Sequence, residues 1–384
     1  MKRLVWALLL SIVAAPGWSA NKKITVQELK DTLAALQQTK KDDFEVSTRL
    51  KEVELSEELT PAAYHDLLQY SPGSLSTVQL NILEGRSATL APPASDLPTA
   101  PAPDVVTQKA ILARTVDYVT RVYMQNPRLI ALRTTSRFQD GVTNIRTNSG
   151  VTNNMPNGDR VWATPNKFME LIGTHTAPVE TDKGVEQVQM QKNTAPWGQN
   201  GQTSEGGAGP ILSVILQEAA GAGTLNFKRW EMVNGKQAAV FSFAVPKKKS
   251  HYAVNYCCFP VTEDAGRMGY EGTGANFQTG TSWIDFKSTV AYHGEFFIIP
   301  ESGVIVRMVT QAELKPTDFV HQEDMRIDYG PVNVDGKLYM LPVDSFTLTE
   351  VVPNGDNYAA VYSVRHTLFN STYQEYQLAG EAAK

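Results

Sequence analysis

The chain has 384 residues, of which 42% are hydrophobic and 20% are charged. This composition is ordinary for a globular protein and excludes a collagen-like repeat, wholesale disorder and a membrane protein with many spans. The 35 basic and 40 acidic residues leave a formal net charge of -5, so there is no general electrostatic reason to expect nucleic-acid binding. Because the length exceeds the roughly 100 to 200 residues of one domain, two structural units are expected.

Residues 1–20 have the pattern of a secretory signal peptide. Lys2 and Arg3 supply the positive charge, residues 4–15 are apolar, and the small residues up to Ala20 suit cleavage. The apolar run is shorter than the roughly 20 residues that a spanning helix needs, which disfavours the alternative of a retained anchor. We therefore expect a periplasmic or secreted protein with no integral membrane segment after cleavage.

Residues 21–90 are predicted to form a helical N-terminal region. Thr25, with Glu28 three positions later, has the spacing of a capping box at a helix start. Thr60 and Pro61 predict a second start, since threonine suits the N-cap and proline the first helical turn. These signals predict a helical unit distinct from the larger remainder of the chain.

A linker is expected at residues 91–103, where proline and alanine dominate. Proline lacks a backbone donor and favours extended conformations, so this linker need not be fully flexible. After it, apolar residues at helical spacing predict an amphipathic helix over residues 105–125.

The rest of the 104–384 domain is predicted to be mostly antiparallel β-structure. Dipeptides of the Asn-Gly and Asp-Gly type favour tight hairpin turns; they lie at 157–158, 234–235, 335–336 and 354–355. Short turns imply antiparallel pairing, whereas a parallel sheet would need helical crossovers. Two segments alternate clearly, with Ala239, Phe241, Phe243 and Val245 on one face of the first and Tyr252, Val254, Tyr256 and Cys258 on one face of the second.

The adjacent cysteines Cys257 and Cys258 lie in the second of these segments. Neighbouring residues in a strand point to opposite faces, so Cys258 is predicted to pack inside and Cys257 to be the more reactive thiol. A strained vicinal disulfide, metal binding and an intermolecular bridge remain alternatives, because exposed thiols rarely stay untouched in an oxidising exterior.

The clearest helix within the β-domain is expected over residues 210–220, after a polar, Gly-rich loop. Its apolar face consists of Ile211, Leu212, Ile215 and Leu216. This face must be covered by protein or by a ligand. We predict that the helix lies across the sheet as a lid over a ligand-binding cavity; a fixed core helix is the alternative.

A helix that leads into a long antiparallel meander, with an apolar helix inserted partway, resembles the fold of periplasmic lipoprotein carriers and related envelope-stress sensor domains. Residues 293–308, HGEFFIIPESGVIVRM, resemble a hairpin of those proteins, in which a strand enters a Pro-containing turn ending in Gly and returns toward an Arg. Residues 327–332 and 335–342 resemble segments of a family of exported bacterial proteins of unknown function. The resemblance covers about residues 105–378 and implies an incomplete barrel around an apolar cavity that holds acyl chains.

The predicted fold class is α+β: a helical N-terminal region plus a strongly curved antiparallel sheet, an incomplete β-barrel with helices on its concave side. A closed barrel or a sandwich is the alternative architecture.

The predicted function is that of an exported, non-catalytic protein that shelters an apolar ligand such as a lipid or an acyl chain. The alternative is a structural or sensory cell-envelope component that binds another protein; a hydrolase acting on an envelope polymer is the third hypothesis. No cofactor and no metal are predicted, because the six histidines are dispersed and no phosphate-binding or dinucleotide-binding glycine motif is found.

Overall fold

A computed structural model describes the chain in several ranges, and the predicted signal peptide lies outside them. The described residues are 23–140, 168–182, 185–188, 201–202, 212–262, 281–315, 317–318, 320–351 and 366–380. For residues 185–188, 201–202, 257–262 and 281–285 only the backbone is described.

The N-terminal region is helical, as predicted. Its helices are α1 (Val26–Gln38), α2 (Asp43–Lys51), α3 (Pro61–Leu67) and α4 (Ser74–Ser87), with the short 3-10 helix η1 (Leu68–Tyr70) after α3. The capping box is confirmed: the Glu28 backbone N–H donates to Thr25 Oγ1, and the Thr25 backbone N–H donates to the Glu28 carboxylate. Thr60 caps α3 and Pro61 occupies its first turn, also as predicted.

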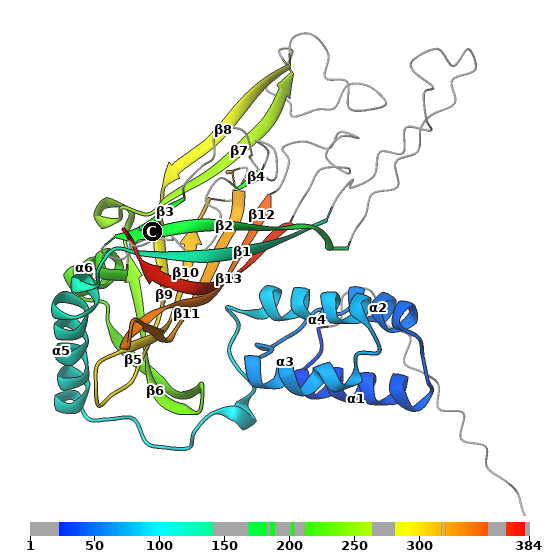
Figure 1. Cartoon of the computed structure of the whole chain (residues 1–384), viewed down its shortest axis with the longest axis horizontal. Coiled ribbons are helices and arrows are strands. Elements are labelled where there is room, and N and C mark those ends of the chain that lie inside the picture. Colours follow the sequence, from blue (N-terminus) through cyan, green and yellow to red (C-terminus); the bar gives the residue numbers. More distant parts are fainter. Residues whose placement is uncertain are drawn as a thin grey trace, which may run out of the picture.

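The second part consists of a sheet and two further helices, α5 (Val105–Arg121) and α6 (Leu212–Ala222) (Figure 1). The ten strands of the main sheet lie in the order β3-β2-β1-β13-β12-β11-β10-β9-β6-β5, and neighbours pair antiparallel. Their bounds are β1 (Leu129–Gln139), β2 (Glu170–Asp182), β3 (Val185–Val188), β5 (Asn226–Val233), β6 (Lys236–Val245), β9 (Ala291–Ile298), β10 (Ile305–Glu313), β11 (Val320–Val334), β12 (Lys337–Val351) and β13 (His366–Leu378).

A smaller, separate sheet has three strands, two of which follow β6 and precede β9 in the chain. Its order is β4-β7-β8, with β4 (Gly201–Gln202), β7 (Ala253–Thr262) and β8 (Thr281–Thr289). The register of β7 against β8 is irregular between Tyr256 and Phe259, where the two cysteines lie. The simple alternation used to assign the cysteine faces is therefore interrupted there.

Two of the predicted hairpin turns fall on described residues, and both are confirmed. Asn234 and Gly235 join β5 to β6, and Asp335 and Gly336 join β11 to β12; all four have positive φ. This is the conformation that Asn-Gly and Asp-Gly turns favour between antiparallel strands. The turns predicted at 157–158 and 354–355 lie outside the described residues.

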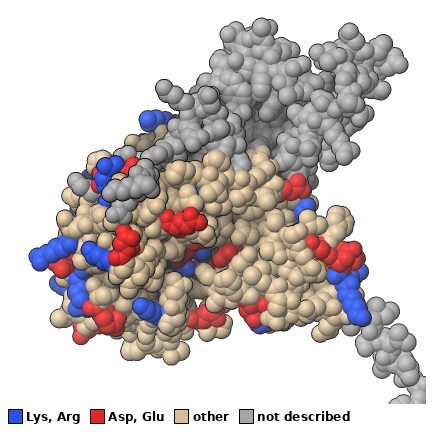
Figure 2. Space-filling view, viewed as in Figure 1, with Lys and Arg blue, Asp and Glu red and all other residues tan. Residues whose placement is uncertain are grey.

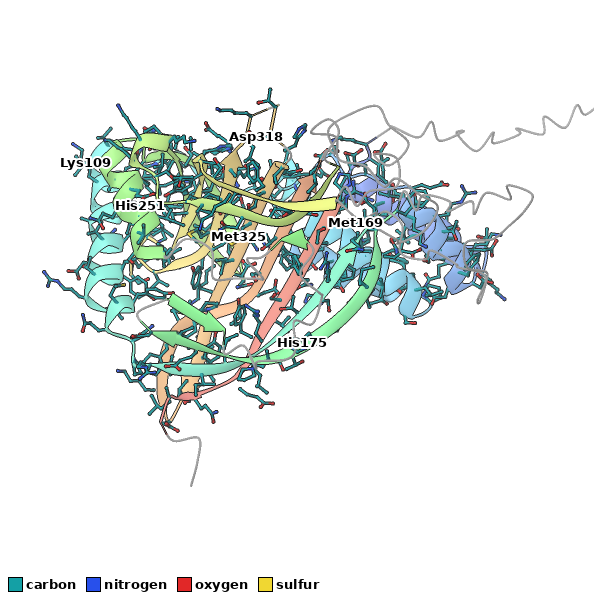
Figure 3. All side chains as sticks on the ribbon, turned by 90° about the horizontal axis from the view of Figure 1, so that it is seen from above. Lys109, Met169, His175, His251, Asp318 and Met325 are labelled. Carbon is teal, nitrogen blue, oxygen red and sulfur yellow. The ribbon has the colours of Figure 1, made fainter. Side chains whose placement is uncertain are left out.

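The two faces of the main sheet are covered by different helices. Alternate residues of β11, among them Met325 and Ile327, belong to one apolar core with α5, α6 and strands β6, β9 and β10. The intervening residues, among them Arg326 and Asp328, point to the other face, where α4 and the chain before α3 pack. In two views α5 and the helices α1 to α4 lie toward opposite ends of the sheet (Figures 1 and 3).

The predicted α+β class is confirmed, but the strong curvature of an incomplete barrel is not seen. The described sheet is open, with β3 and β5 at its edges, and it is not strongly curled. Because helices pack on both faces of the described sheet, the sheet forms a middle layer.

The segment predicted as a linker connects α4 to α5 and contains one short 3-10 helix, η2 (Ala94–Asp96). It is held to the protein at both ends. The Glu58 backbone N–H donates to the Ala91 carbonyl at 2.8 Å, and Trp230 Nε1 donates to the Pro101 carbonyl at 2.8 Å. The segment is therefore a mostly extended connection that is fixed to the protein near both of its ends.

Candidate functional site

The predicted lid helix is α6, and protein covers its apolar side chains. Leu212, Ile215 and Leu216 are 2%, 0% and 4% exposed and pack in the core with α5 and β6. Ile211 lies outside the described residues. The buried Glu218 of α6 accepts a hydrogen bond from the Tyr292 hydroxyl of β9 at 2.6 Å. These contacts favour the fixed core helix, and the lid stays a prediction.

We expect Leu212→Ala to cost about 2 to 5 kcal/mol of unfolding free energy, because it would leave a cavity in a core without a ligand to fill it. Urea unfolding of the mature chain measures the loss, with the exposed Gln217→Ala of the same helix as the control. A loss under about 1 kcal/mol, or a rise in melting temperature when a fatty acid is added, would instead support the lid.

The cysteine pair lies in β7, and the side chains of Cys257 and Cys258 lie outside the described part of the chain. The predicted difference in their reactivity therefore stays a prediction. Within the described residues no three His, Cys, Asp or Glu side chains gather as metal ligands would.

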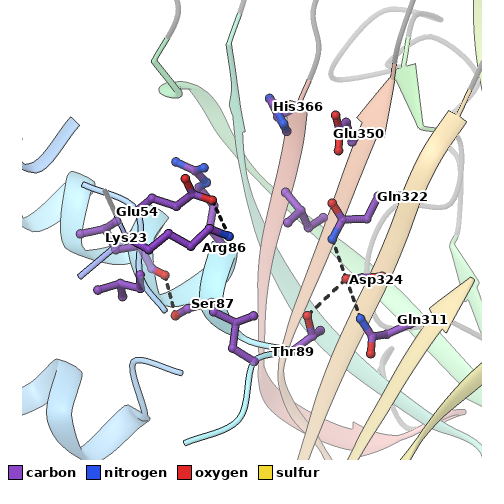
Figure 4. A pocket seen from close by; sticks show the side chains of 14 residues that line it. Lys23, Glu54, Arg86, Ser87, Thr89, Gln311, Gln322, Asp324, Glu350 and His366 are labelled. Atoms are coloured by element: carbon purple, nitrogen blue, oxygen red, sulfur yellow. Dashed lines mark hydrogen bonds and ion pairs between the residues drawn. The ribbon is translucent and has the colours of Figure 1, made fainter. Parts of the chain in front are cut away.

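A polar pocket of about 370 Å³ lies between the helical region and the main sheet (Figure 4). One wall comes from the chain before α1, the segment after α2, and α4 with the residues after it. The other wall comes from β10, β11, β12 and β13, on the face opposite α5 and α6. The lining residues are Lys23, Glu54, Leu55, Leu83, Arg86, Ser87, Thr89, Leu90, Gln311, Gln322, Asp324, Leu348, Glu350 and His366.

Asp324 lies at the junction of the two walls. Its Oδ2 accepts hydrogen bonds from Gln322 Nε2 at 2.6 Å, Gln311 Nε2 at 3.0 Å and Thr89 Oγ1 at 3.2 Å. Burial raises the pKa of this carboxyl, and the three hydrogen bonds only partly oppose that effect. The network fixes the chain after α4 against β10 and β11.

His366, the first residue of β13, lines the sheet wall of the pocket (Figure 4). Its Nδ1 lies 2.6 Å from Oδ2 of the buried Asp140, whose Oδ1 also accepts the His366 backbone N–H at 2.8 Å. Glu350 is paired with His366 across β12 and β13, and with Gln322 across β11 and β12. The sheet wall therefore presents a row of Gln322, Glu350 and His366.

The helical wall supplies the basic groups of the pocket. Lys23 Nζ forms an ion pair with Glu54 at 2.9 Å. Arg86, in the last turn of α4, is half-buried, and among the described residues no carboxylate lies within ion-pair distance of it. The Ser87 hydroxyl already forms hydrogen bonds within the protein, because its Oγ donates to the Leu83 carbonyl and accepts a hydrogen bond from the Leu59 backbone N–H. Arg86 is thus available to a bound molecule.

The interface between the helical region and the main sheet also contains a buried ionic network. Glu58 Oε1 accepts from Arg307 Nη1 and from Arg326 Nη1, both at 3.1 Å. The two guanidiniums also pair with Asp328, at 2.6 Å from Arg307 Nε and 3.0 Å from Arg326 Nε. Glu58, Arg307 and Arg326 side chains are at most 4% exposed. None of these residues belongs to a motif that predicts a site from the sequence.

The network shifts its carboxyl groups in opposite directions. Burial disfavours ionisation of Asp328, but the two guanidiniums outweigh it and hold the pKa of Asp328 below its usual value. For Glu58 burial is the larger effect, so its pKa is raised although Arg307 and Arg326 oppose the shift. Burial also raises the pKa of Glu84 to about 8 and that of Asp344 to about 7. The interface therefore contains more carboxyl groups than it can keep ionised.

The visible outer face in Figure 2 carries interspersed acidic and basic side chains, without a continuous surface of one sign. Within the described ranges, none of the helices combines the length and the apolar character needed to cross a bilayer. Comparison with known proteins finds no matching family model, no similar curated protein and no similar solved structure.

Proposed function

We propose that the protein is an exported, non-catalytic binding protein that holds a small polar ligand between α4 and strands β10 to β13. The main support for this proposal is the polar pocket, whose volume lies within the roughly 300 to 1,000 Å³ typical of small-molecule sites. The predicted signal peptide supports export. This proposal changes the ligand class expected from the sequence, because the pocket is polar and the apolar face of α6 is already covered by protein.

The two walls favour a ligand that carries both an acidic group and hydrogen-bond donors. Arg86 presents a guanidinium without an acidic partner among the described residues, and guanidiniums bind carboxylates through paired hydrogen bonds. The opposite wall offers the Glu350 carboxylate, which has no described ion-pair partner, beside the Gln322 amide. An amphoteric molecule such as a short peptide with free termini satisfies both walls.

The non-catalytic part of the proposal is supported by how the polar groups of the pocket are held. The Ser87 hydroxyl is engaged by two backbone groups, and the Thr89 hydroxyl donates to Asp324. The described hydrogen bonds of these hydroxyls go to groups other than His366, whereas a nucleophile would be bonded to its base. Because the side chains of Ser87, Thr89 and Asp324 are held by hydrogen bonds, they suit ligand recognition by a rigid site better than catalysis.

The ligand class is tested by calorimetric titration of the mature chain with alanine-containing di- and tripeptides, each with a free carboxylate or as the carboxyl-terminal amide. We expect the free acids to bind roughly tenfold to a hundredfold more tightly than the amides, since a hydrogen bond to a charged group contributes about 1.5 to 3 kcal/mol. Arg86→Gln should abolish this difference.

Arg121→Gln, on the exposed end of α5, is the matched control and should bind like the unaltered chain. Equal affinity for acids and amides, or an Arg86→Gln variant that keeps the preference, would contradict the proposed recognition. If no peptide binds, the alternative of a cell-envelope component that binds another protein gains weight. Phe44 and Leu75, which are 70% and 49% exposed at neighbouring helix starts, would then offer its apolar contact.

A further inference from the structure

The interface between α4 and the sheet buries more acidic than basic side chains. Among the described residues, its carboxyl groups come from both sides: Glu58 and Glu84 from the helical region and Glu231, Asp328 and Asp344 from the sheet. They face the two buried guanidiniums of Arg307 and Arg326. The five carboxyl groups thus exceed the two guanidiniums by three. Arg229 pairs with Glu231 at 2.7 Å and with Glu295 at 2.9 Å. Counting Arg229 and Glu295 as well leaves the excess of three carboxyl groups unchanged.

Glu84 and Asp344 are the members of this cluster with the weakest compensation. Glu84 lies 3.8 Å from Arg326 Nη2, which is too long for a hydrogen bond. Asp344 Oδ1 is buried without a hydrogen-bond partner, and within the described residues no cation lies at ion-pair distance from Asp344. An ionised carboxylate in such a place is costly, so the neutral, protonated form is favoured.

The charged and titratable groups near Glu84 and Asp344 come from β10, β11 and α3. Arg326 and Asp328 of β11 and Arg307 of β10 act on both of them. From the helical side, the half-buried Tyr64 of α3 lies near both carboxyls, and its own pKa is raised above 10, so it stays neutral in the range considered. The arginines stay charged throughout, and Asp328 stays ionised.

We propose that α4 docks on the sheet in a proton-dependent way, and that alkaline pH loosens this docking and opens the adjacent pocket. Glu84 faces the cluster while Leu83, Arg86 and Ser87 of the same helix line the pocket, so any shift of α4 changes both together. The effect on ligand binding rests on the function proposed above. The pH dependence of α4 docking is independent of that proposed function.

The sign follows from the two raised pKa values. A carboxyl whose pKa is higher in the docked state contributes its stabilisation fully below its ordinary pKa, near 4, and loses it as pH rises through the docked-state pKa. These values are about 7 for Asp344 and about 8 for Glu84. Docking should therefore weaken as pH rises from about 4 to about 8, and change little above the two docked-state pKa values.

Hydrogen exchange of the mature chain without ligand tests this directly. After correction for the intrinsic rate, we expect exchange of the α4 amides to rise at least about tenfold between pH 6 and pH 9, since each such carboxyl shifts the equilibrium about tenfold for each pH unit that lies between its ordinary pKa and its docked-state pKa. Glu84→Gln and Asp344→Asn should each reduce this rise, and the double variant should nearly remove it. Circular dichroism at pH 6 confirms that the variants are folded.

Two exposed substitutions serve as controls: Glu45→Gln on α2, and Asp335→Asn in the β11–β12 turn. Both should keep the pH dependence of the unaltered chain. Corrected α4 exchange that is equal at pH 6 and pH 9, or a double variant that keeps the full dependence, would overturn the proposal. Because no ligand is present, these outcomes are independent of the peptide titration, which is performed at pH 6.

Discussion

Replacing Glu58 by alanine should be among the most destabilising single substitutions in the chain, at about 3 to 5 kcal/mol of unfolding free energy. One carboxylate oxygen accepts from both Arg307 and Arg326, and all three side chains are at most 4% exposed. Removing one member of a buried ionic network leaves its partners desolvated without compensation. Chemical denaturation of the mature chain at pH 7 measures the loss.

Glu58→Gln separates charge from hydrogen bonding, because the amide oxygen can still accept from an arginine. We expect it to cost less than Glu58→Ala. Glu45→Ala, at an exposed position of α2, is the control and should change stability by under about 0.5 kcal/mol. A loss of only about 1 kcal/mol for Glu58→Ala would mean that water or Asp328 replaces the lost acceptor, and that the helical region is held mainly by apolar contacts.

Gly303→Ala should destabilise the protein by about 2 to 4 kcal/mol, through left-handed strain plus overpacking. Gly303 ends the β9–β10 turn with φ of 74°, and a Cβ there would lie 2.5 Å from the Arg114 carbonyl oxygen and 2.6 Å from the Thr115 nitrogen. Both atoms are backbone of α5 and cannot move aside alone. Thermal unfolding followed by circular dichroism measures the effect.

Gly336→Ala is the matched control for this substitution. Gly336 has φ of 80° in the β11–β12 turn, but nothing lies within 4 Å of the position of its Cβ. It should cost only the strain, about 1 to 2 kcal/mol. Equal losses at the two positions would show that the contact between the turn and α5 contributes little to stability.

Local patterns in the sequence predicted much of the local structure. Thr25 with Glu28, and Thr60 with Pro61, indicated helix starts because the chemistry of a cap involves only three or four consecutive residues. The Asn234-Gly235 turn was equally local. By contrast, β1 was not predicted. Its buried positions include Arg133 and Arg137, so it lacks the apolar alternation of a strand with one face in a core.

The candidate site could not be predicted for a related reason. In β11, Asp324, Arg326 and Asp328 alternate with apolar residues, a pattern typical of a strand with one face in water. Here that face is covered by α4 and the chain around Glu58, more than 200 residues earlier. No local pattern records such a pairing. The inward positions of Leu212, Ile215 and Leu216 in α6 were predicted correctly, but whether protein or ligand covers them depends on tertiary packing.

The position of β1 in the sheet limits the order in which the chain can fold. Strand β1 lies between β2 and β13, so Leu129 is paired with Leu378 across almost the whole length of the domain. Contacts between residues so far apart in sequence form late and slowly. Until β13 emerges, the hairpin of β1 and β2 has no partner on its inner edge, and the sheet cannot be completed. The main sheet of a chain with this topology therefore stays incomplete until its last strand, β13, has been synthesised.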